Sequence, residues 1–332
     1  MKAMVIRSFG GPEVFEMADM PKPIVRPGHV LVEVIASSLN PVETKIRSGA
    51  AAAISPQFPA ILNGDFSGRI VEVGPDCEPW RPGDEVFGCA GGVAKIQGAL
   101  AEFMLVDIRL IARKPANITH QTAALYPLAI ITAWEGVMEN GFVTAGDKVL
   151  VHGASGGVGH LATQLLKLQE AVTYGTVTSA AKGAMARKYG TDEIIVMPEE
   201  PAQYTERFTA GRGFDAIFDT VGGLHLLESF AAARYEAKVC TINARTTLNI
   251  GEMHAKALSL RAVYMLIPLL HNIERERHGL ILTRVAKLIE AEELHVHQAD
   301  RVFSFSEIGE AHRYFAARRG TGKTALVNDL KG

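Results

Sequence analysis

The segment that most constrains the chain is residues 149–167, VLVHGASGGVGHLATQLLK, where an apolar run meets a glycine-rich turn and then an amphipathic stretch. The apolar run predicts a buried strand, and the spacing of Val158, Leu161 and Leu165 predicts a helix with one apolar face. Glycines at this junction let the backbone approach a pyrophosphate, which the helix N-terminus can bind. The segment therefore predicts a dinucleotide site that contains Ala154, Ser155, Gly156, Gly157, Val158 and Gly159.

Ala154 stands where the best-known pattern of this kind has its first glycine. That glycine serves a tight turn, whereas Gly156 would allow the close approach of a phosphate and Gly159 the close packing of the helix. The pattern A-x-G-G-x-G can therefore still form the site. A tight strand-to-helix turn without a ligand is the alternative interpretation.

The chain after Lys148 alternates short apolar runs with helical stretches, which predicts right-handed βαβ units around a parallel sheet. We expect helices at 157–168, 182–189 and 224–233. Six apolar runs, the last at 259–266, match the doubly wound dinucleotide-binding plan.

The first 120 residues show the alternation and turn residues of an antiparallel β-domain, and they predict a twisted, partly closed barrel. After residue 268 come a helix, a strand (301–307, RVFSFSE), a second helix and a final strand, which do not continue the βα alternation. We expect them to complete the first domain. The predicted class is α/β, with residues 1–121 and 268–332 in one domain and residues 122–267 inserted as a dinucleotide-binding domain.

The end of the second predicted parallel strand indicates which nicotinamide cofactor is bound. An NAD site usually carries Asp or Glu there, bonded to the ribose hydroxyls, but the chain has no acidic residue from Tyr174 to Met185. Thr178 and Ser179 can bond a 2′-phosphate, and Lys182 can supply positive charge. The sequence therefore favours NADP(H), although Lys182 could also be an ordinary solvated helix residue.

Charge and cysteine content exclude several other classes of protein. Thirty-four Lys and Arg against 36 Asp and Glu give a net charge of −2, which favours neither nucleic acid nor an anionic membrane surface as a partner. The chain has no long apolar run and no secretory signal pattern, and its three cysteines are widely separated. We expect a cytoplasmic protein with a small-molecule substrate.

Several motifs in a fixed order make the chain recognisable. They are LNPVETKIRSG (39–49), GDFSGRIVEVG (64–74), RPGDEVFG (81–88), HGASGGVG (152–159), FDTVGG (218–223) and EAHRYFAARRGTGKTALV (310–327). Over essentially its whole length the chain resembles the medium-chain dehydrogenase/reductase superfamily, in its zinc-independent quinone oxidoreductase (zeta-crystallin-like) branch. The resemblance implies a GroES-like catalytic domain, an inserted Rossmann domain, an active site in the cleft between them, and a homodimer joined near residues 259–266.

The same resemblance bears on metal binding. Asn40 and Asp65 occupy positions that hold a Cys and a His ligand in the zinc alcohol dehydrogenases, and an amide with one carboxylate cannot replace a thiolate and an imidazole as zinc ligands. The lobe that carries four cysteines for a structural zinc has only Cys89. We therefore predict no metal.

The resemblance also implies the remaining site residues. Asn40 would bond the cofactor ribose or the substrate oxygen, and Thr132 would reach the nicotinamide; a loop cap and a helix turn are their respective alternatives. Lys45, where quinone reductases often have Tyr, could donate to a developing enolate or to the ribose, or could be an exposed lysine paired with Glu43. The loop beside the nicotinamide would contain Val221, Gly222, Gly223 and Asn243.

These residues predict a zinc-independent, NADPH-dependent oxidoreductase that transfers hydride to a quinone or another α,β-unsaturated carbonyl. In such acceptors, charge moves to an oxygen that a few hydrogen-bond donors can stabilise. The cofactor would supply the hydride chemistry. A zinc-type alcohol or aldehyde dehydrogenase and a non-enzymatic, crystallin-like nucleotide-binding protein are the alternatives.

Overall fold

The computed structural model describes residues 1–139, 141–317 and 321–330 of the 332-residue chain. These residues fall into two compact units, residues 1–128 with 266–332 and residues 129–265. The sequence had placed the first boundary after residue 121. Helix α2 (His120–Ala123) belongs to the first unit because it packs against that unit's sheet, where the His120 Nδ1 atom lies 2.8 Å from the Ser67 hydroxyl.

The first unit is built on antiparallel strands. Its strands are β1 (Lys2–Ile6), β2 (Phe15–Asp19), β3 (His29–Leu39), β4 (Asp65–Val73), β5 (Glu85–Cys89), β6 (Phe103–Asp107), β7 (Ile111–Arg113), β14 (Phe303–Ser304) and β15 (Thr324–Val327). Its helices are α1 (Pro41–Arg47), α2, α9 (Ile267–His271), α10 (Arg275–Glu290) and α11 (Ile308–Ala316), with 3-10 turns η1 (Pro12–Val14), η2 (Ala52–Ile54), η3 (Ile108–Leu110) and η5 (Phe305–Glu307).

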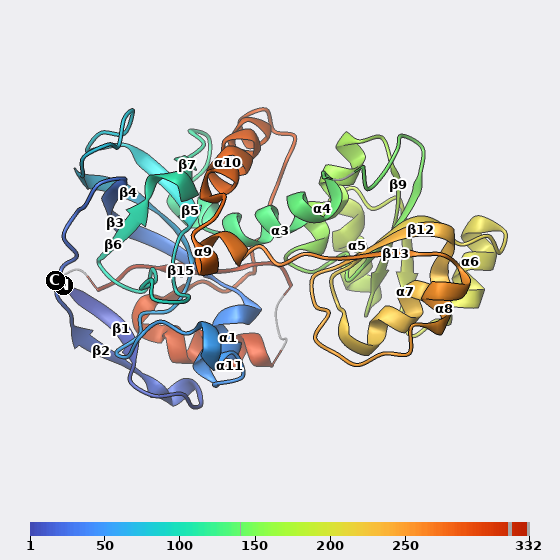
Figure 1. Ribbon diagram of the computed structural model, residues 1–332, viewed down its shortest axis with the longest axis horizontal. Helices are drawn as coiled ribbons and strands as arrows, with labels where there is room; N and C mark the ends of the chain where they lie inside the picture. Colours follow the sequence, from blue (N-terminus) through green and yellow to red (C-terminus); the bar gives the residue numbers. More distant parts are fainter. Residues whose placement is uncertain (140, 318–320, 331–332) are drawn as a thin grey trace. The chain divides into compact units, whose positions relative to one another are not determined.

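Strand β3 organises this unit because it pairs with three other strands. It pairs with β6 through its first half, with β15 through its last residues, and with β4 along most of its length. Two register shifts in the β3–β4 pair mark bulges, which bend a sheet toward a barrel. Figure 1 shows β15, from the red end of the sequence, in the same unit as the blue β1, so the predicted return of the chain is confirmed.

The predicted strand at 301–307 is wrong over most of its length. Only Phe303 and Ser304 form a strand, and a 3-10 turn begins directly after them. The Ser304 backbone N–H donates to the Glu307 carboxylate at 2.8 Å, which caps the turn and the helix that follows. The alternation of apolar residues in 301–307 predicted a strand, but the capping bond at Ser304 ends the strand there and starts the turn.

The second unit contains a parallel sheet in the order β10-β9-β8-β11-β12-β13, the doubly wound order that the sequence predicts. The strands are β8 (Lys148–His152), β9 (Val172–Val177), β10 (Glu193–Val196), β11 (Phe214–Asp219), β12 (Ala233–Thr241) and β13 (Ser259–Ala262). The helices are α4 (Gly159–Leu168), α5 (Ala180–Lys188), α6 (Pro201–Thr209), α7 (Leu226–Ala232) and α8 (Gly251–Ala255), with the 3-10 turn η4 (Gly223–His225). Helix α3 (Pro127–Val137) crosses the boundary between the units.

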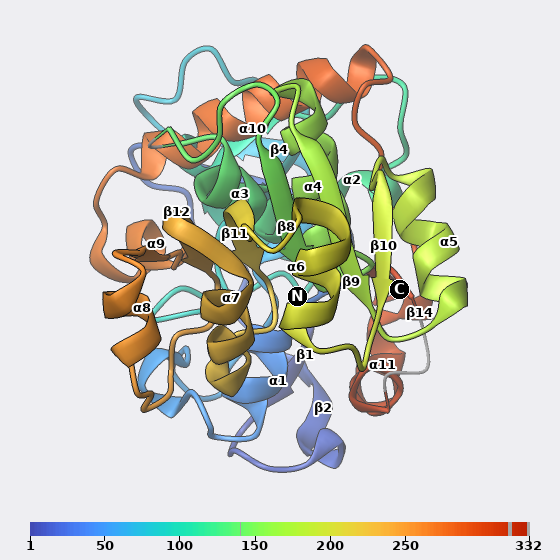
Figure 2. The same ribbon diagram turned by 90° about the vertical axis from the view of Figure 1, so that its right-hand side faces the viewer.

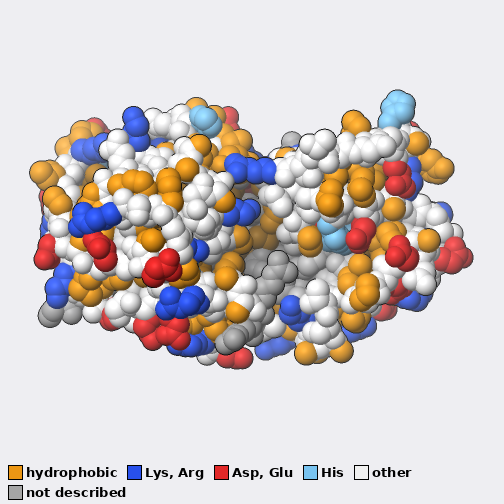
Figure 3. Space-filling view, turned by 90° about the horizontal axis from the view of Figure 1, so that it is seen from below, with side chains coloured by type: hydrophobic (Ala, Val, Ile, Leu, Met, Phe, Trp, Pro, Cys, Tyr) orange, Lys and Arg blue, Asp and Glu red, His pale blue; other side chains and the backbone are white. Residues whose placement is uncertain are grey.

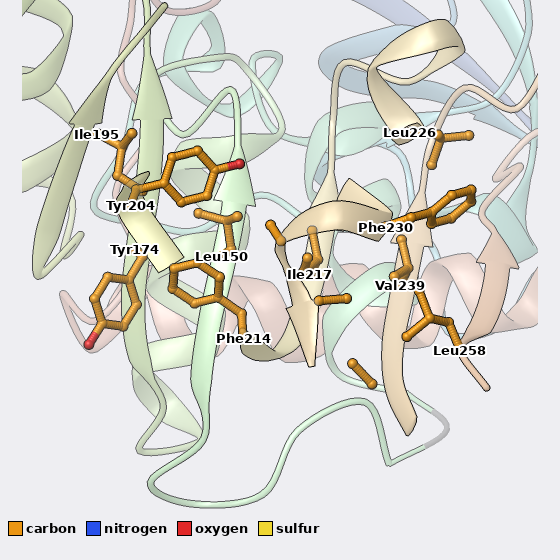
Figure 4. Close-up of a cluster of buried hydrophobic side chains, with 13 residues drawn as sticks. Leu150, Tyr174, Ile195, Tyr204, Phe214, Ile217, Leu226, Phe230, Val239 and Leu258 are labelled. Atoms are coloured by element: carbon orange, nitrogen blue, oxygen red, sulfur yellow. The ribbon is translucent and has the colours of Figure 1, made fainter. Parts of the chain in front are cut away.

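The core of the second unit lies between its sheet and its helices. Helix α5 packs against β9 and β10, and α7 packs against β11 and β12 (Figure 2). Leu150, Ile217 and Val239 come from three neighbouring strands and belong to one buried cluster with Phe214 and Phe230 (Figure 4). This buried apolar surface supplies most of the stability that fixes the strand ends.

The surface carries charges of both signs. On the face drawn in Figure 3, Lys and Arg side chains are interspersed with Asp and Glu side chains, in keeping with the net charge of −2. None of the described helices has the length and apolar character that a membrane crossing requires.

Candidate functional site

The turn between β8 and α4 is shaped by two of its glycines. Gly153 has φ +73°, a conformation that residues with a side chain rarely adopt, and its carbonyl accepts the Gly156 N–H at 2.8 Å. A Cβ atom on Gly159 would lie 2.2 Å from the same carbonyl. The close packing of helix on turn that the sequence predicts for Gly159 is therefore present.

Ala154 is accommodated by a glycine in the neighbouring strand. Its side chain is fully buried, and a Cβ atom on Gly175 of β9 would lie only 2.6 Å from the Ala154 methyl group. The positive φ of the turn falls on Gly153 rather than on Ala154. The turn thus keeps its geometry without a glycine at position 154.

The N-terminus of α4 presents free donors. Among the described residues, none accepts the backbone N–H of Gly157 or of Val158, and the capping residue Val158 has no side-chain acceptor. Unpaired N–H groups at the start of a ten-residue helix, together with its dipole, form an anion site. The turn therefore fits a pyrophosphate, and Ser155 lies half-buried within it.

The predicted nicotinamide-side residues are brought together at the ends of β11 and β12. The Asn243 carbonyl accepts the Gly223 N–H at 2.9 Å, and the Asn243 amide donates to the Val221 carbonyl at 3.2 Å. Gly222 has φ +69°, and a Cβ atom there would lie 2.2 Å from the Asn243 carbonyl oxygen. Only glycine fits at this close approach.

Asp219, which the sequence reasoning missed, holds this loop. One carboxylate oxygen accepts the N–H groups of Val221 and Gly222, each at 2.8 Å, and the other accepts the Ser229 hydroxyl at 3.1 Å. Burial alone would raise the pKa of Asp219, but the hydrogen bond with His225 and the charges around it keep that pKa below its usual value. An acid just before a Gly-Gly pair in FDTVGG was the available signal.

Two histidines complete the surroundings of Asp219. His225 Nδ1 lies 3.5 Å from the Asp219 carboxylate, and the His152 and His225 rings meet edge to face with centroids 4.3 Å apart. Burial lowers the pKa of His152 to about 3. Burial also opposes a charge on His225, but the hydrogen bond to Asp219 and the negative charges of Asp219 and Glu228 together outweigh it and raise the pKa of His225. His152 is therefore neutral at physiological pH.

The end of β9 places the three predicted 2′-phosphate residues together. The Ser179 hydroxyl caps α5, and the Lys182 ammonium donates to the Thr178 hydroxyl at 3.0 Å. Arg187, on the same helix, donates to the Asp192 carbonyl at 2.7 Å. Because β8, β9, β11 and β12 are neighbouring parallel strands, all these groups lie at one carboxyl edge of the sheet, which we call the cofactor edge.

In the first unit, four polar side chains form what we call the buried cluster: Asn40, Glu43, Asp65 and Lys323, each at most 4% exposed. Asn40 caps α1, Asp65 begins β4 and Lys323 immediately precedes β15. The Asn40 amide nitrogen donates to Asp65 at 2.9 Å and to Glu43 at 3.4 Å, and its oxygen accepts the Lys323 ammonium. Both amide hydrogens are therefore engaged, and one acceptor lone pair is left.

Glu43 is the unusual acid of the buried cluster. Burial, then the nearby charge of Asp65, raises its pKa from the usual 4.5 to about 7, against the opposing effect of Lys323. Its carboxylate also accepts the Asn40 backbone N–H at 2.7 Å. The predicted loop cap at Asn40 is thus a helix cap, and it coexists with side-chain bonds that the sequence did not reveal.

Lys45 and Thr132 lie outside the buried cluster. The Lys45 side chain is exposed on α1, and among the described residues its ammonium has no hydrogen-bond or ion-pair partner. Glu43 turns toward Asn40 instead, so the alternative pairing of Lys45 with Glu43 is wrong. Thr132 is buried on α3, in the second unit.

The donor set of the buried cluster does not fit a zinc ion. Asn40 and Asp65 offer an amide oxygen and a carboxylate, and the ammonium of Lys323 already lies against both. Within the described ranges, no three His, Cys, Asp or Glu side chains are grouped as a metal would require. The absence of a metal stays a prediction, supported by this donor chemistry.

Comparisons with known families cover both units. Residues 26–116 match the alcohol dehydrogenase GroES-like domain family, and residues 189–326 match the family described as zinc-binding dehydrogenase. The mitochondrial NAD(P)H oxidoreductase RTN4IP1 of Mus musculus is 30% identical over 98% of this chain and 89% of its own length.

Two further relatives have narrower descriptions. The human quinone oxidoreductase is 29% identical over 76% of this chain and 75% of its own length. The chloroplastic NADPH-dependent alkenal/one oxidoreductase of Arabidopsis thaliana is 34% identical over 67% of this chain and 58% of its own length.

The fold is shared with a solved structure. An alcohol dehydrogenase superfamily protein from Novosphingobium aromaticivorans superposes with a TM-score of 0.93 at 34% identity, covering 98% of this chain and 99% of the other. The predicted fold class, a GroES-like domain with a Rossmann-type parallel sheet, is confirmed.

Proposed function

We propose that this chain, which belongs to the zinc-independent quinone oxidoreductase branch of the medium-chain dehydrogenase/reductase superfamily, is an NADPH-dependent reductase of quinones or other α,β-unsaturated carbonyls. The observation that carries the proposal is the cofactor edge, where a glycine turn with unpaired N–H groups and a carboxylate-held loop meet on neighbouring strands. The relatives named for NAD(P)H and NADPH support it.

Each part of the cofactor edge has a role in this proposal. The pyrophosphate binds at the turn formed by Gly156, Gly157 and Val158. The 2′-phosphate binds to the Thr178 hydroxyl and the Lys182 ammonium. The loop from Val221 to Gly223 adjoins the nicotinamide. When bound, NADPH supplies a hydride, so the protein has mainly to bind, orient and exclude competing reactions.

The substrate oxygen needs a hydrogen-bond donor, because negative charge collects there as hydride adds to the conjugated system. Asn40 is unsuited to this task since both of its amide hydrogens go to carboxylates; its remaining lone pair suits a hydroxyl, such as that of a ribose. Lys45 has an unpaired ammonium, and we assign it the donor role. Thr132 retains its proposed role beside the nicotinamide.

A homodimer is also part of the proposal. Strand β13 ends the parallel sheet, and among the described residues its outer edge pairs with no strand. Leu260 and Tyr264 expose 36% and 39% of their surfaces there. An unprotected edge with apolar side chains suits pairing with a second copy. The cytoplasmic location stays a prediction.

The experiment is a titration of chelator-treated protein with NADPH and with NADH, followed by assays with a para-quinone and a simple enone. Tighter binding of NADPH and turnover of either acceptor are expected. Tight NADPH binding without turnover on a broad panel would favour the crystallin-like alternative, and activity that appears only after zinc is added would favour a zinc-type dehydrogenase.

A further inference from the structure

A buried histidine lies beside the glycine turn of the cofactor edge. His160 is the second residue of α4, it is fully buried, and its Nδ1 atom lies 2.8 Å from the Gly156 carbonyl oxygen. A carbonyl oxygen can only accept a hydrogen bond, so Nδ1 carries a proton and donates it. His160 follows the last glycine of the pattern A-x-G-G-x-G, so the pattern itself gives this side chain no role.

The Gly156 carbonyl accepts two hydrogen bonds from the same residue. The His160 backbone N–H donates to it at 3.2 Å, in the spacing of an α-helix, and the imidazole adds the shorter bond at 2.8 Å. The N–H of Gly156 is already engaged with the Gly153 carbonyl. The turn therefore holds the N–H of Gly156, and the histidine holds its carbonyl.

The orientation of this carbonyl sets the direction of a phosphate donor. In a trans peptide the C=O of one residue and the N–H of the next lie in one plane and point in opposite directions, so the Gly156 carbonyl and the Gly157 N–H rotate together. The Gly157 N–H has no acceptor among the described residues, and it is one of the donors proposed for the pyrophosphate. While His160 binds the carbonyl, this N–H points away from His160, out of the start of α4.

A peptide between two glycines needs such a restraint. Gly156 and Gly157 have no Cβ atoms, so rotation of the peptide plane between them meets few steric barriers. Gly156 is also exposed, and a Cβ atom placed on it would approach only the Gly153 carbonyl oxygen, at 3.1 Å. A rotated plane would turn a carbonyl oxygen toward the pyrophosphate, and the negative charges of the two groups would repel each other.

The imidazole is itself held in place by its surroundings. Its ring packs edge to face against the ring of Tyr189, which follows α5, with the ring centroids 5.3 Å apart. Tyr189 is only 9% exposed, so this contact belongs to the interior of the second unit. A side chain that is fixed in this way orients the carbonyl before a ligand arrives, and binding then needs less ordering of the turn.

We propose that His160 is a positioning residue for the cofactor: its Nδ1–H group holds the Gly156 carbonyl and thereby directs the Gly157 N–H to the pyrophosphate. The inference rests on the proposed function, because it requires a dinucleotide at this turn. NADPH and NADH both carry a pyrophosphate, so their binding depends on His160 to the same extent. The 2′-phosphate contacts of Thr178 and Lys182 are independent of it.

The test compares His160→Asn and His160→Leu, two replacements of nearly equal size. The asparagine amide can donate from the position of Nδ1, whereas leucine has no donor. Calorimetric titration gives the Kd of each variant for NADPH, for NADH and for 2′-AMP, a fragment without a pyrophosphate. His160→Leu should weaken both dinucleotides by roughly three- to tenfold, the contribution of one hydrogen bond, and His160→Asn should restore most of the loss. The Kd of 2′-AMP should stay unchanged, and His254→Leu, at an exposed histidine of α8, is the matched control.

Two results would overturn this inference while leaving the proposed function intact. One is a parent that binds NADPH together with equal dinucleotide Kd values for His160→Asn and His160→Leu, and the other is a loss of 2′-AMP affinity as large as that of NADPH. A parent that binds neither dinucleotide would overturn the proposed function as well. If His160→Leu does not fold, judged by circular dichroism, the ¹⁵N NMR spectrum of the parent decides. The His160 imidazole should carry a proton on Nδ1, and a proton on Nε2 alone would overturn the inference.

Discussion

Lys45 and Glu43 lie two residues apart on α1, yet their side chains meet opposite environments. Glu43 points into the buried cluster, where it accepts two hydrogen bonds from Asn40, and Lys45 extends into solvent. A helix turns about 100° per residue, so neighbours two apart do not share a face. Glu43 therefore belongs to the buried cluster, whereas Lys45 is accessible to a bound ligand.

Lys45→Met should lower kcat for an enone by about a hundredfold, because a positioned proton donor contributes at least this much to such a step. The Kd of NADPH, measured by fluorescence titration, should change little. Lys287→Met is the control, since Lys287 is also exposed but lies on α10. An unchanged kcat in Lys45→Met would remove Lys45 from the chemistry.

Glu43 makes the stability of the fold depend on pH. Its pKa is about 7 in the folded protein against the usual 4.5, so between these values the folded state holds a proton that the unfolded state releases. The free energy of unfolding should therefore fall as pH rises through this window, by up to about 3 kcal/mol from this group.

Glu43→Gln should flatten this dependence. The urea midpoints of the parent and the variant are measured from pH 4 to pH 8. As pH rises, the midpoint of the parent should fall relative to that of the variant. Glu72→Gln, at an exposed glutamate of β4, should reproduce the parent profile. A parent–variant difference independent of pH would show that folding does not raise the pKa of Glu43.

At the scale of residues, the sequence motif indicates Asn40 but not the partners of its side chain. The motif suggested a polar residue at the substrate end, whereas the bond from Lys323 joins residues 283 apart and depends on β15 pairing with β3. Asp219 was missed for a similar reason. Its carboxylate accepts hydrogen bonds from the backbone N–H groups of a turn, and the shape of that turn depends on the positive φ of Gly222.

At the scale of elements, the β8–α4 turn was the most predictable part of the chain. Glycine spacing predicted the close approach of Gly159 to the turn, which the structure has. The compensation of Ala154 by Gly175 could not be read from the sequence, since it depends on the register in which β8 and β9 pair. The helix itself begins at Gly159 rather than at 157.

Gly159→Ala should disrupt the turn. The new methyl group would lie 2.2 Å from the Gly153 carbonyl, so the turn must shift, at a cost of about 1–3 kcal/mol. We expect a roughly tenfold or greater loss of NADPH affinity together with a lower Tm. Gly156→Ala, whose methyl would lie 3.1 Å from the same oxygen, should lower the Tm less, and equal losses of Tm in the two variants would contradict the packing argument.

Lys182→Met should narrow the preference for NADPH over NADH. A charge-assisted hydrogen bond contributes about 1.5–3 kcal/mol, so the ratio of the two Kd values should fall by roughly tenfold to a hundredfold while NADH binding is unchanged. Lys188→Met is the matched control because Lys188, on the same helix, lies over the Tyr189 ring. Equal losses for both cofactors would point to damage of α5 rather than to a 2′-phosphate contact.

At the scale of the whole molecule, the sequence predicted the inserted domain but placed its first boundary seven residues early. The change from β-type to helical composition near residue 121 is real, but α2 packs on the sheet of the first unit. Composition reports local structure, whereas a boundary depends on which surface a helix covers.

The proposed dimer gives a prediction for the whole molecule. Sedimentation should show two chains per particle, and Leu260→Lys should shift the population toward the monomer, because a charge on an edge strand opposes strand pairing. Val172→Lys, at an exposed position on β9 inside the sheet, is the control. A monomeric parent at micromolar concentration would contradict the dimer.

The most direct test of the central claim follows the hydride itself. Chelator-treated protein is incubated with a simple enone and NADPH carrying deuterium at C4 of the nicotinamide, in separate preparations for its two faces, and the product is analysed by mass spectrometry. We predict one deuterium at the β-carbon of the saturated product from one of the two labelled cofactors, without added metal. A product without deuterium from either cofactor, or reduction only after zinc is restored, would contradict direct, metal-independent hydride transfer.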